Sequence, residues 1–429
     1  MRPLGLAGLA IVLVSCNRSP ERRQVPSSPA DASPSSADGR EQGSTLARAT
    51  QLALGHDHTC VLLADGVVRC WGLGTFGRLG TGSTATIGDD EPASAGKRVE
   101  LGAKAVAITA GTMHTCALLE SRRVRCWGQG KMGALGYGTP DDVGDDETPA
   151  SIGDVPLGED VVQVAAGGSV TCALLVSGSV RCWGDNLDGA LGLPGTKQPR
   201  YIGDDEPVDS LPAIKLDRKV LAIGGARAEM CALFDDRKVR CWGELIGSPD
   251  PEHAAEKRRD IDVGADVAKL AGSTLMCVVT TRGGARCWGS GRALAEGVGV
   301  ERNSGDDWTV LADTPDLPLP APVEEIAMSG DHACVLLAGG KVRCWGDRRL
   351  GILGVPPGDV VSVGDAVEVE LGEPATDVAV GAFHSCALSS TGAVRCWGMA
   401  KDGRLGYGTA ENVGEKRAPA AVGTVPLQP

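Results

Sequence analysis

Residues 110 to 128 read AGTMHTCALLESRRVRCWG, two short apolar runs joined by a polar turn, with one cysteine in each run. A turn of small or polar residues between such runs indicates a β-hairpin. The stretch recurs, because fourteen of the fifteen cysteines form seven pairs with the same spacing, and each pair ends in Cys-Trp-Gly. The pairs are Cys60 with Cys70, Cys116 with Cys126, Cys172 with Cys182, Cys231 with Cys241, Cys277 with Cys287, Cys334 with Cys344, and Cys386 with Cys396. A hairpin repeated seven times therefore organises residues 46–429.

The spacing of the repeats favours a propeller. The first cysteines of successive pairs lie 56, 56, 59, 46, 57 and 52 residues apart, a period typical of propellers and solenoids. The 61 glycines and 25 prolines interrupt any 3.6-residue apolar period and argue against long helices. Residues 155–157 and 161–165 are two further strand candidates before the third hairpin, and four short strands make one propeller blade. A parallel β-helix is the structural alternative.

The register of each hairpin follows from its symmetry. If the turn lies midway between the two cysteines, the first hairpin pairs Cys60 with Cys70, Leu62 with Val68, and Thr59 with Trp71. Both faces of the hairpin are then largely apolar or aromatic. Each hairpin must therefore be covered on both sides, as stacked blades are.

The two ends of the repeat region predict how a ring would close. Residues 423–428 (GTVPLQ) match residues 153–158 (GDVPLG), a segment that the first repeat lacks. We expect the C-terminal segment to pair into the first blade, which would close the ring and remove its exposed edges.

The motifs of the repeat resemble those of a known family. They are the Ala-Gly-x-x-His-Thr-Cys-Ala-Leu-Leu strand, the Val-Arg-Cys-Trp-Gly strand and the following Gly-x-Leu-Gly, as at residues 133–136 and 403–406. This pattern is similar to the regulator of chromosome condensation repeat family, and the resemblance implies an all-β, seven-bladed β-propeller. It implies no single activity, because that scaffold serves nucleotide exchange on a small GTPase in eukaryotes and protein binding or inhibition elsewhere. Residues 244–262 lack Gly-x-Leu-Gly, so we expect atypical outer loops in repeats four and five.

The N-terminus predicts export. An apolar run at residues 4–14 is too short for an ordinary membrane span and, after Met1 and Arg2, is typical of a signal peptide. The run ends in Leu-Val-Ser-Cys, which resembles the bacterial lipobox and implies cleavage before Cys16 and lipidation of that residue. We expect a signal peptide at 1–15, a Ser/Pro-rich tether without a core at 16–45, and the propeller at 46–429. A plain signal peptide with an incidental cysteine is the alternative.

Localisation and disulfides follow from export. We expect a lipid-anchored protein of the bacterial cell envelope, and Asn17 after the lipidated cysteine is compatible with sorting to the outer membrane. Exported proteins meet oxidising conditions, where an even number of cysteines suggests disulfides. Opposed strand positions bring the Cα atoms near the separation that a disulfide tolerates, so we predict seven disulfides within the hairpins. Seven pairs of reduced, buried thiols are the alternative.

Metal, cofactor and catalytic sites have no specific support. Zinc needs four ligands close together, whereas each cysteine pair has no second pair beside it. A histidine precedes the first cysteine in only four repeats, and we expect those four to hydrogen-bond hairpins to turns: His58, His114, His332 and His384. The dinucleotide-like GxGxxG matches at 72–77 and 128–133 open no helix in a βαβ unit. We therefore predict no metal, no cofactor and no catalysis.

Acidic turns recur at one place in the repeat. Gly-Asp-Asp-Glu occupies residues 88–91, 144–147 and 203–206, and Gly-Asp-Asp occupies 305–307, which would set them along one rim of a ring. Calcium or a cationic partner is one interpretation. Turn formation on a solvated surface is the interpretation we favour. The net charge of −13 argues against nucleic acid.

The leading functional hypothesis is a monomeric propeller that binds a protein partner through variable loops. The candidate contact residues differ among otherwise repeated loops and are Phe76, Met132, Tyr137, Trp308, Arg348, Arg349 and Tyr407. An enzyme is the alternative, and it would need titratable residues from several blades to converge in the central cavity. A purely structural envelope component is the third possibility.

Overall fold

The computed structural model describes residues 48–186, 189–193, 200–225, 229–243, 259–272, 276–289, 300–301 and 311–428. The expected signal peptide, Cys16 and the tether lie outside these residues, and so do Trp308 and the acidic segment 305–307. Within the described part, no helix has the length and apolar character needed to cross a membrane.

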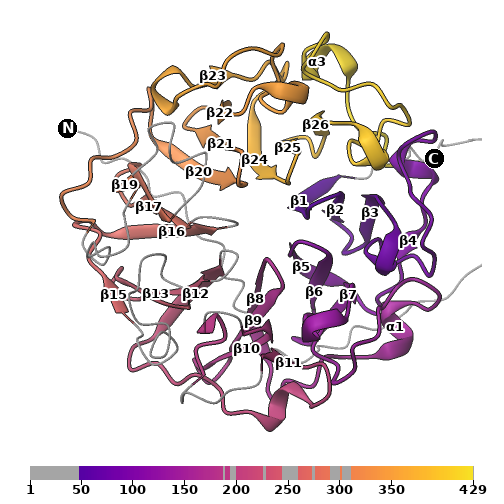
Figure 1. The fold of residues 1–429 in the computed structure, drawn as a ribbon, viewed down its shortest axis with the longest axis vertical. Coiled ribbons are helices and arrows are strands. Elements are labelled where there is room, and N and C mark those ends of the chain that lie inside the picture. The colour runs from indigo at the N-terminus through magenta and orange to yellow at the C-terminus, as the bar shows by residue number, and fades with distance from the viewer. Residues whose placement is uncertain are drawn as a thin grey trace, which may run out of the picture. The chain divides into compact units, whose positions relative to one another are not determined.

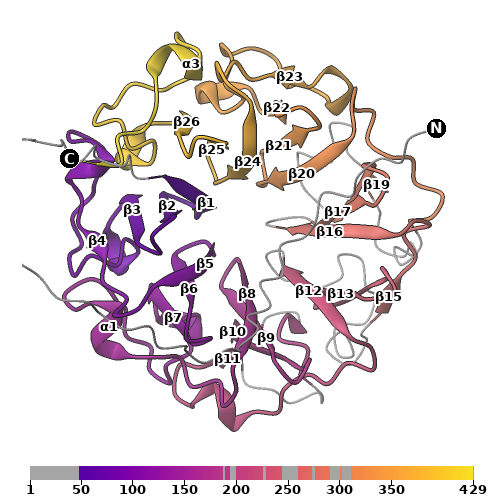
Figure 2. The same cartoon turned by 180° about the vertical axis from the view of Figure 1, so that it is seen from behind.

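The described residues form seven β-sheets arranged as the blades of a ring around a central axis (Figure 1). The innermost strands surround that axis, as the reverse view also shows (Figure 2), and they are β1 (Ala49–Leu54), β5 (Ala105–Ala110), β8 (Val161–Gly167), β12 (Val220–Gly225), β16 (Val267–Gly272), β20 (Val323–Met328) and β24 (Ala375–Val380). The all-β, seven-bladed propeller predicted from the repeats is confirmed.

The repeated hairpin supplies the middle two strands of each blade. The second strands are β2 (His58–Leu63), β6 (His114–Leu119), β9 (Val170–Leu175), β13 (Glu229–Phe234), β17 (Met276–Thr280), β21 (His332–Leu337) and β25 (His384–Ser389). The third strands are β3 (Val68–Gly72), β7 (Val124–Gly128), β10 (Val180–Asp185), β14 (Val239–Gly243), β18 (Ala285–Gly289), β22 (Lys341–Gly346) and β26 (Val394–Gly398). Both faces of this hairpin are buried, because neighbouring blades cover them.

Short elements complete the outer edge. Fourth strands are β4 (Arg98–Val99), β11 (Tyr201–Ile202), β15 (Arg259–Ile261), β19 (Val300–Glu301) and β23 (Val367–Glu368). Single helical turns are α1 (Pro149–Ile152), α3 (Pro419–Val422), η1 (Thr75–Gly77), η2 (Ala93–Ala95), η3 (Lys131–Gly133), η5 (Val208–Ser210), η7 (Arg349–Gly351), η8 (Val363–Asp365) and η9 (Lys401–Gly403). Strand β19 runs parallel to β18, whereas the other fourth strands run antiparallel to their neighbours. This reversal marks the atypical fifth repeat.

The predicted hairpin register is confirmed. The first hairpin pairs Cys60 with Cys70, Leu62 with Val68, and Thr59 with Trp71. The two cysteines of every other hairpin are opposed in the same way. The register therefore repeats in all seven blades.

All seven predicted cysteine pairs are joined as disulfides in the structure. Their Cα–Cα separations are 4.0 to 4.1 Å. The bonds join Cys60 with Cys70, Cys116 with Cys126, Cys172 with Cys182, Cys231 with Cys241, Cys277 with Cys287, Cys334 with Cys344, and Cys386 with Cys396. Each disulfide thus links the two middle strands of one blade and none crosses between blades.

The expected closure by the C-terminal strand is wrong. The Val425 N–H donates to the Val394 carbonyl (2.8 Å), so the last segment lies along β26 of the seventh blade. Residues 155–157 behave in the same way, because the Val155 N–H donates to the Val124 carbonyl of the second blade (2.9 Å). The segment before each inner strand is therefore the outer edge of the preceding blade, and the first blade is complete without the C-terminus.

Where the structure describes the loops after the third strands, these loops contact the next blade. The loop after β26 reaches the first blade, where the Trp71 Nε1–H donates to the Arg404 carbonyl (3.1 Å). The same bond joins Trp183 to the Ala134 carbonyl (3.0 Å). Trp397 donates in the same way to the Ile352 carbonyl (3.1 Å), so the Gly-x-Leu-Gly motif supplies an acceptor to the Trp of the next blade at the closing joint and at two others.

All four histidines contact the next blade, and His332 also makes the expected hairpin-to-turn contact, because its Nδ1 lies 3.0 Å from Ser329 Oγ in the turn of its own blade. The His58 Nε2 lies 2.8 Å from Thr115 Oγ1 in the next blade, and His384 lies at the same distance from Thr59 Oγ1 across the closing joint. Burial keeps these rings neutral and lowers the pKa of His58 to about 3 and of His114 to about 4. A neutral ring can exchange a single hydrogen bond with a hydroxyl group without an uncompensated charge.

Candidate functional site

The turns between first and second strands lie on the same face of the ring as the loops that follow the third strands. The Leu73 N–H donates to the Asp57 carbonyl (2.9 Å), and the Met399 N–H donates to the Phe383 carbonyl (2.9 Å). We call this side of the ring the loop face. The hairpin turns, such as residues 64–66, lie at the opposite ends of the strands.

Four loops on the loop face present a side chain from the same unusual backbone position. Phe76, Met132, Leu350 and Asp402 precede the first glycine of Gly-x-Leu-Gly, and their φ angles are 62°, 70°, 58° and 60°. We call these four residues the loop ridge. Residues other than glycine rarely adopt this left-handed conformation. Phe76 is 40% exposed and Leu350 is 36% exposed, so apolar side chains are held outward from short, fixed turns.

The predicted contact residues divide into two groups. Phe76 and Met132 lie on the loop ridge, and Arg348 and Arg349 lie beside it in the sixth blade. Leu350 and Asp402 were missed by sequence reasoning, although alignment of the residue before Gly-x-Leu-Gly would have found them.

The two predicted contact tyrosines are half-buried and pack against their own blades. The Tyr137 hydroxyl donates to the Cys126 carbonyl (3.0 Å) and accepts from the Cys126 N–H (3.0 Å). Tyr407 makes the same pair of bonds to Cys396, and burial raises its pKa to about 12. The positions therefore differ from the expected surface role, because each tyrosine fastens a glycine-rich loop to the disulfide-bonded strand.

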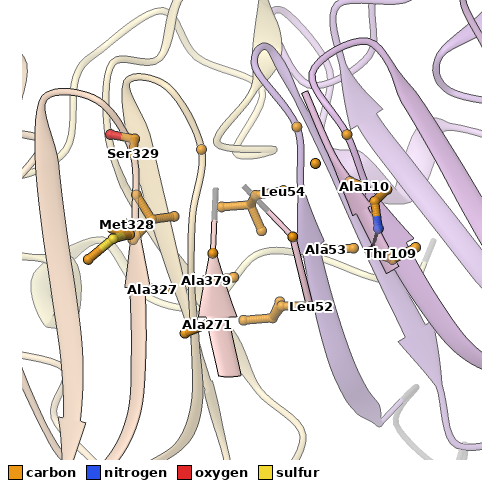
Figure 3. A pocket seen from close by; sticks show the side chains of 18 of the residues that line it. Leu52, Ala53, Leu54, Thr109, Ala110, Ala271, Ala327, Met328, Ser329 and Ala379 are labelled. Carbon is orange, nitrogen blue, oxygen red and sulfur yellow. Dashed lines mark hydrogen bonds between the residues drawn. The ribbon is translucent and has the colours of Figure 1, made fainter. Parts of the chain in front are cut away.

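A central cavity of about 680 Å³ lies on the ring axis, within the range of small-molecule sites. The inner strands line it mainly with small and apolar side chains, among them Ala53, Ala110, Ala271, Ala327 and Ala379 (Figure 3). It extends to the turns after the inner strands, including residues 55–56 and 381–383, and so reaches the loop face.

Four polar residues of the cavity wall, Gln51, Gln163, Glu325 and Asp377, come from one position, the third residue of an inner strand, and others such as His56 and Asp331 lie in the turns after the inner strands. Gln51 makes two hydrogen bonds to the backbone of the next inner strand. Its Nε2–H donates to the Ile108 carbonyl (3.0 Å), and its Oε1 accepts from the Ile108 N–H (2.9 Å). Gln163 makes the same two hydrogen bonds to the backbone of Ile223. Ala107 and Ala222 occupy this position in the second and fourth blades.

The last three blades place ionisable groups at the same position. Lys269 Nζ lies 4.0 Å from Glu325 Oε2, and Glu325 and Asp377 both line the cavity. Burial and the neighbouring Asp377 raise the pKa of Glu325 to about 7. Burial also raises the pKa of Asp377, whose Oδ2 accepts from the Leu52 N–H (3.3 Å). Sequence reasoning missed this cluster, which appears only when the inner strands are aligned.

A buried ion cluster lies on the loop face at the joint between the seventh and first blades. Asp57 Oδ1 is 2.9 Å from Arg404, and its Oδ2 is 3.5 Å from Arg78. Both arginines are 1% exposed. Although burial opposes ionisation, the hydrogen bond with His56 and the two arginines lower the pKa of Asp57 to about 2. A carboxylate shared by two guanidinium groups thus links a loop of each blade.

The acidic turns take equivalent positions in the first three blades. The carboxylate oxygens of Asp89, Asp90 and Glu91 lie within 4.8 Å of one another, as do those of the two matching turns. The Glu91 Oε1 accepts from the Gly88 N–H (3.3 Å), and Glu147 repeats this bond with Gly144 (3.0 Å). These bonds support the turn-forming interpretation.

The family comparison agrees with the repeat pattern. Models of the regulator of chromosome condensation (RCC1) repeat match residues 49–78, 105–134, 161–190, 323–351 and 375–404, and a second model of that repeat matches residues 65–118 and 123–174.

Individual proteins with similar sequences carry different activities. The chain is 27% identical to the ultraviolet-B receptor UVR8 of Arabidopsis thaliana over 83% of this chain and 78% of that protein. It is 26% identical to the guanine nucleotide exchange factor SRM1 of Saccharomyces cerevisiae over 80% of each. Among solved structures, human WBSCR16 matches with a TM-score of 0.63 and 21% identity, over 80% of this chain and 91% of that one, which supports the fold.

Proposed function

This chain belongs to the regulator of chromosome condensation repeat family, and on that premise we propose that it is a lipid-anchored protein of the bacterial cell envelope whose propeller binds a partner protein through the loop ridge. Proteins similar to it are named as a receptor and an exchange factor, so activity in this family depends on the surface of the scaffold rather than on its fold.

The loop ridge is the observation that carries this proposal. A left-handed conformation costs a residue with a Cβ atom roughly 1 to 2 kcal/mol, and glycine would avoid that cost. The chain nevertheless keeps Phe76, Met132 and Leu350 at this position in three loops that are otherwise glycine-rich. Strained residues of this kind persist where their side chains have a use.

The chemistry of the ridge fits a protein partner. Exposed aromatic and aliphatic side chains on fixed turns are typical anchors of protein interfaces. The net charge of −13 disfavours a phosphate backbone as the alternative occupant.

The docking surface can be tested by replacing Phe76, Met132 and Leu350 together with Asn, which tolerates the left-handed conformation. Crosslinking of the full chain in envelope preparations, followed by mass spectrometry, should identify a partner that the triple variant loses at least tenfold. The matched control replaces Val106, Val162 and Leu221 with Thr. These residues are also exposed, at 54%, 52% and 39%, but lie near the start of the inner strands and away from the loop face. Equal crosslinking of the partner by both variants and by the parent protein would show that the loop ridge is not the docking surface.

The lipid anchor rests on the sequence Leu-Val-Ser-Cys at residues 13–16. Cys16→Ser should move the protein from the membrane fraction to the soluble fraction without changing its melting temperature. A variant that stays in the membrane fraction would contradict the anchor.

An enzyme with a site in the central cavity is the second candidate, and one observation favours it. Lys269, Glu325 and Asp377 come from three successive blades, which is the convergence that a catalytic site would need.

A further inference from the structure

We propose that the face of the ring opposite the loop face rests on the surface of a phospholipid bilayer, with exposed apolar side chains of the second, third and fourth blades in contact with the lipids. We call it the hairpin-turn face, because the hairpin turns lie on it. This inference rests on the lipid anchor proposed above, and the experiment below separates the two. The loop ridge would then point away from the membrane, toward a partner protein.

The first argument is the place where the chain enters the propeller. Arg48 lies at the hairpin-turn face, because its carbonyl accepts from the Ala64 N–H (2.9 Å) and its Nη2–H donates to the Ser390 carbonyl (2.9 Å). Ala64 and Ser390 belong to the hairpin turns of the first and seventh blades. Residues 17–47 separate this point from the proposed lipidation site, Cys16, and as a flexible tether they would span roughly 30 Å. A tether that starts at the hairpin-turn face keeps this face nearest to the membrane.

The second argument is a set of exposed apolar side chains on this face. The second residue of the inner strand is Val106 in the second blade, Val162 in the third and Leu221 in the fourth, and all three are exposed. Val176 is exposed in the hairpin turn of the third blade, and its N–H donates to the Asp160 carbonyl just before the inner strand (3.0 Å). We call these four hydrophobic residues the apolar arc. Apolar side chains gathered on one face of a rigid fold are typical of contact with a protein or a membrane.

The fold does not require apolar side chains at this position of the inner strand, where the pairing with the second strand is interrupted by a bulge. In the first blade Thr50 occupies it, and its hydroxyl group donates to the Leu62 carbonyl (3.1 Å). Thr376 makes the equivalent bond in the seventh blade (3.2 Å), and Glu324 occupies the position in the sixth. Valine and leucine cannot make this bond, so their side chains serve the surface rather than the strand.

The third argument is that exposed cations border the apolar arc. Lys104 and Lys219 lie two residues before the apolar residues of the second and fourth blades. Arg122 is exposed in the hairpin turn of the second blade, and its carbonyl accepts from the Val161 N–H at the start of the third blade (2.9 Å). Arg122 keeps a left-handed conformation (φ 63°) at the turn position that Gly178 takes in the third blade, which indicates a use for its side chain. Such cations can reach lipid phosphates while their apolar neighbours contact the acyl chains.

The distribution of carboxylates also distinguishes the two faces. Three carboxylates of the hairpin-turn face are held in ion pairs, namely Asp160 with Arg123, Asp236 with Arg218, and Asp266 with Lys238. Glu120 and Asp235 are exposed there, so contact with the membrane depends mainly on the apolar arc. The acidic turns lie on the loop face, because the Gly144 carbonyl accepts from the Gly82 N–H of the loop that carries Phe76 (3.0 Å). An anionic lipid surface would therefore repel the loop face more strongly.

Lysine footprinting of the full, lipidated chain in vesicles of phosphatidylethanolamine and phosphatidylglycerol tests this orientation. Acetylation with a water-soluble reagent is followed by mass spectrometry, and the reference is the Cys16→Ser protein without vesicles. We expect Lys104 and Lys219 to react at least fivefold more slowly in the vesicles. The internal controls are Lys131 and Lys401, which are exposed on the loop face and should react equally in both samples.

Substitution of the apolar arc tests its role. The triple variant Val106→Asp, Val162→Asp, Leu221→Asp should stay in the vesicle fraction through its lipid, whereas Lys104 and Lys219 should react as fast as in the Cys16→Ser protein. The matched control is Val360→Asp, at an exposed apolar residue beside the loop-face end of β22, and it should keep both lysines protected. Because the lipid alone keeps the protein at the membrane, substitutions in the arc should leave partner binding at the loop ridge unchanged.

Two outcomes would separate this inference from the proposal on which it rests. Co-sedimentation of the parent protein with vesicles, without protection of Lys104 and Lys219, would overturn the membrane contact and leave the lipid anchor standing. Failure of the parent protein to co-sediment would overturn both. A second copy of the chain is the alternative occupant of the arc. Protection of the same lysines in the Cys16→Ser protein without vesicles, lost on dilution, would identify that copy and overturn the membrane contact.

Discussion

Glu229 shows how a single residue changes the joint between two blades. It begins β13, at the position where four other second strands begin with a histidine that contacts a hydroxyl group of the next blade. Its Oε1 instead accepts from the Trp288 Nε1–H (3.3 Å), and Glu229 is 8% exposed. Burial raises the pKa of Glu229 to about 8. The protein therefore holds a neutral carboxyl group where the other joints hold a neutral imidazole.

Glu229→Gln should stabilise the protein at neutral and alkaline pH. A folded-state pKa raised from 4.5 to about 8 contributes stability that is present below pH 4.5 and is lost as the pH rises toward 8. The cost in the parent protein is about 3 kcal/mol at pH 7. Gln keeps the acceptor for Trp288 and does not titrate, so the melting temperature of the variant should exceed that of the parent at pH 8 and match it at pH 4. Identical melting curves at pH 8 would show that Glu229 is not neutral in the folded protein.

At the scale of the loop, glycines let one blade approach the tryptophan of the next. Gly406 has a φ of 76°, and a Cβ atom there would lie 2.6 Å from Trp71 Nε1. Gly178, in the hairpin turn of the third blade, also has a positive φ, 84°, but a Cβ atom there would meet nothing within 4 Å. Arg122 and Arg237 occupy the same turn position in the second and fourth blades, with φ angles of 63° and 64°. Substitution of Gly178 therefore measures the cost of the backbone conformation alone, whereas substitution of Gly406 adds the cost of a steric clash with Trp71.

Gly178→Ala should lower the free energy of unfolding by about 1 to 2 kcal/mol, the cost of a left-handed alanine. Gly406→Ala should cost several kcal/mol in total, because Trp71 is completely buried and its bond to the Arg404 carbonyl would break. Urea denaturation of the two variants measures the difference. Equal midpoints would mean that the loop moves away from Trp71 at little cost.

The hairpins could be predicted from the sequence because their signal is local. The pairing of Cys60 with Cys70 follows from a turn and a two-residue period. The outer strand was assigned to the wrong blade, because residues 155–157 lie near β8 in the sequence and the hydrogen bond to Val124 is not local. The same error produced the wrong closure. Glu325 and Asp377 could not be placed on one cavity wall either, since their positions around the axis depend on the arrangement of successive blades.

The whole ring closes through side chains and loops rather than through a shared strand. β1 and β24 belong to different sheets, although they lie side by side around the axis (Figure 1). What distinguishes this joint is the cluster of Asp57, Arg78 and Arg404, because Ala134 and Ala190 replace the arginines in the second and third blades. In a ring of similar repeats, a charge pattern found at one joint favours the pairing of the first blade with the last.

Asp57→Asn should open this joint, because it leaves the buried Arg78 without its ion-pair partner and leaves Arg404 with Asp402 alone, at a cost of about 3 to 5 kcal/mol. The loss should appear as faster amide hydrogen exchange in β1 and β24 than in the parent protein, with exchange in β8 and β9 unchanged. The triple variant Asp57→Met, Arg78→Ala, Arg404→Ala takes the residues found at the equivalent positions of the second blade, Met113 and Ala134, and removes all three charges together. It should recover most of the lost stability, since replacing a whole buried ion cluster costs far less than removing one partner. A triple variant less stable than Asp57→Asn would show that the arginines stabilise this joint by packing. The pairing of the first blade with the last would then not depend on these charges.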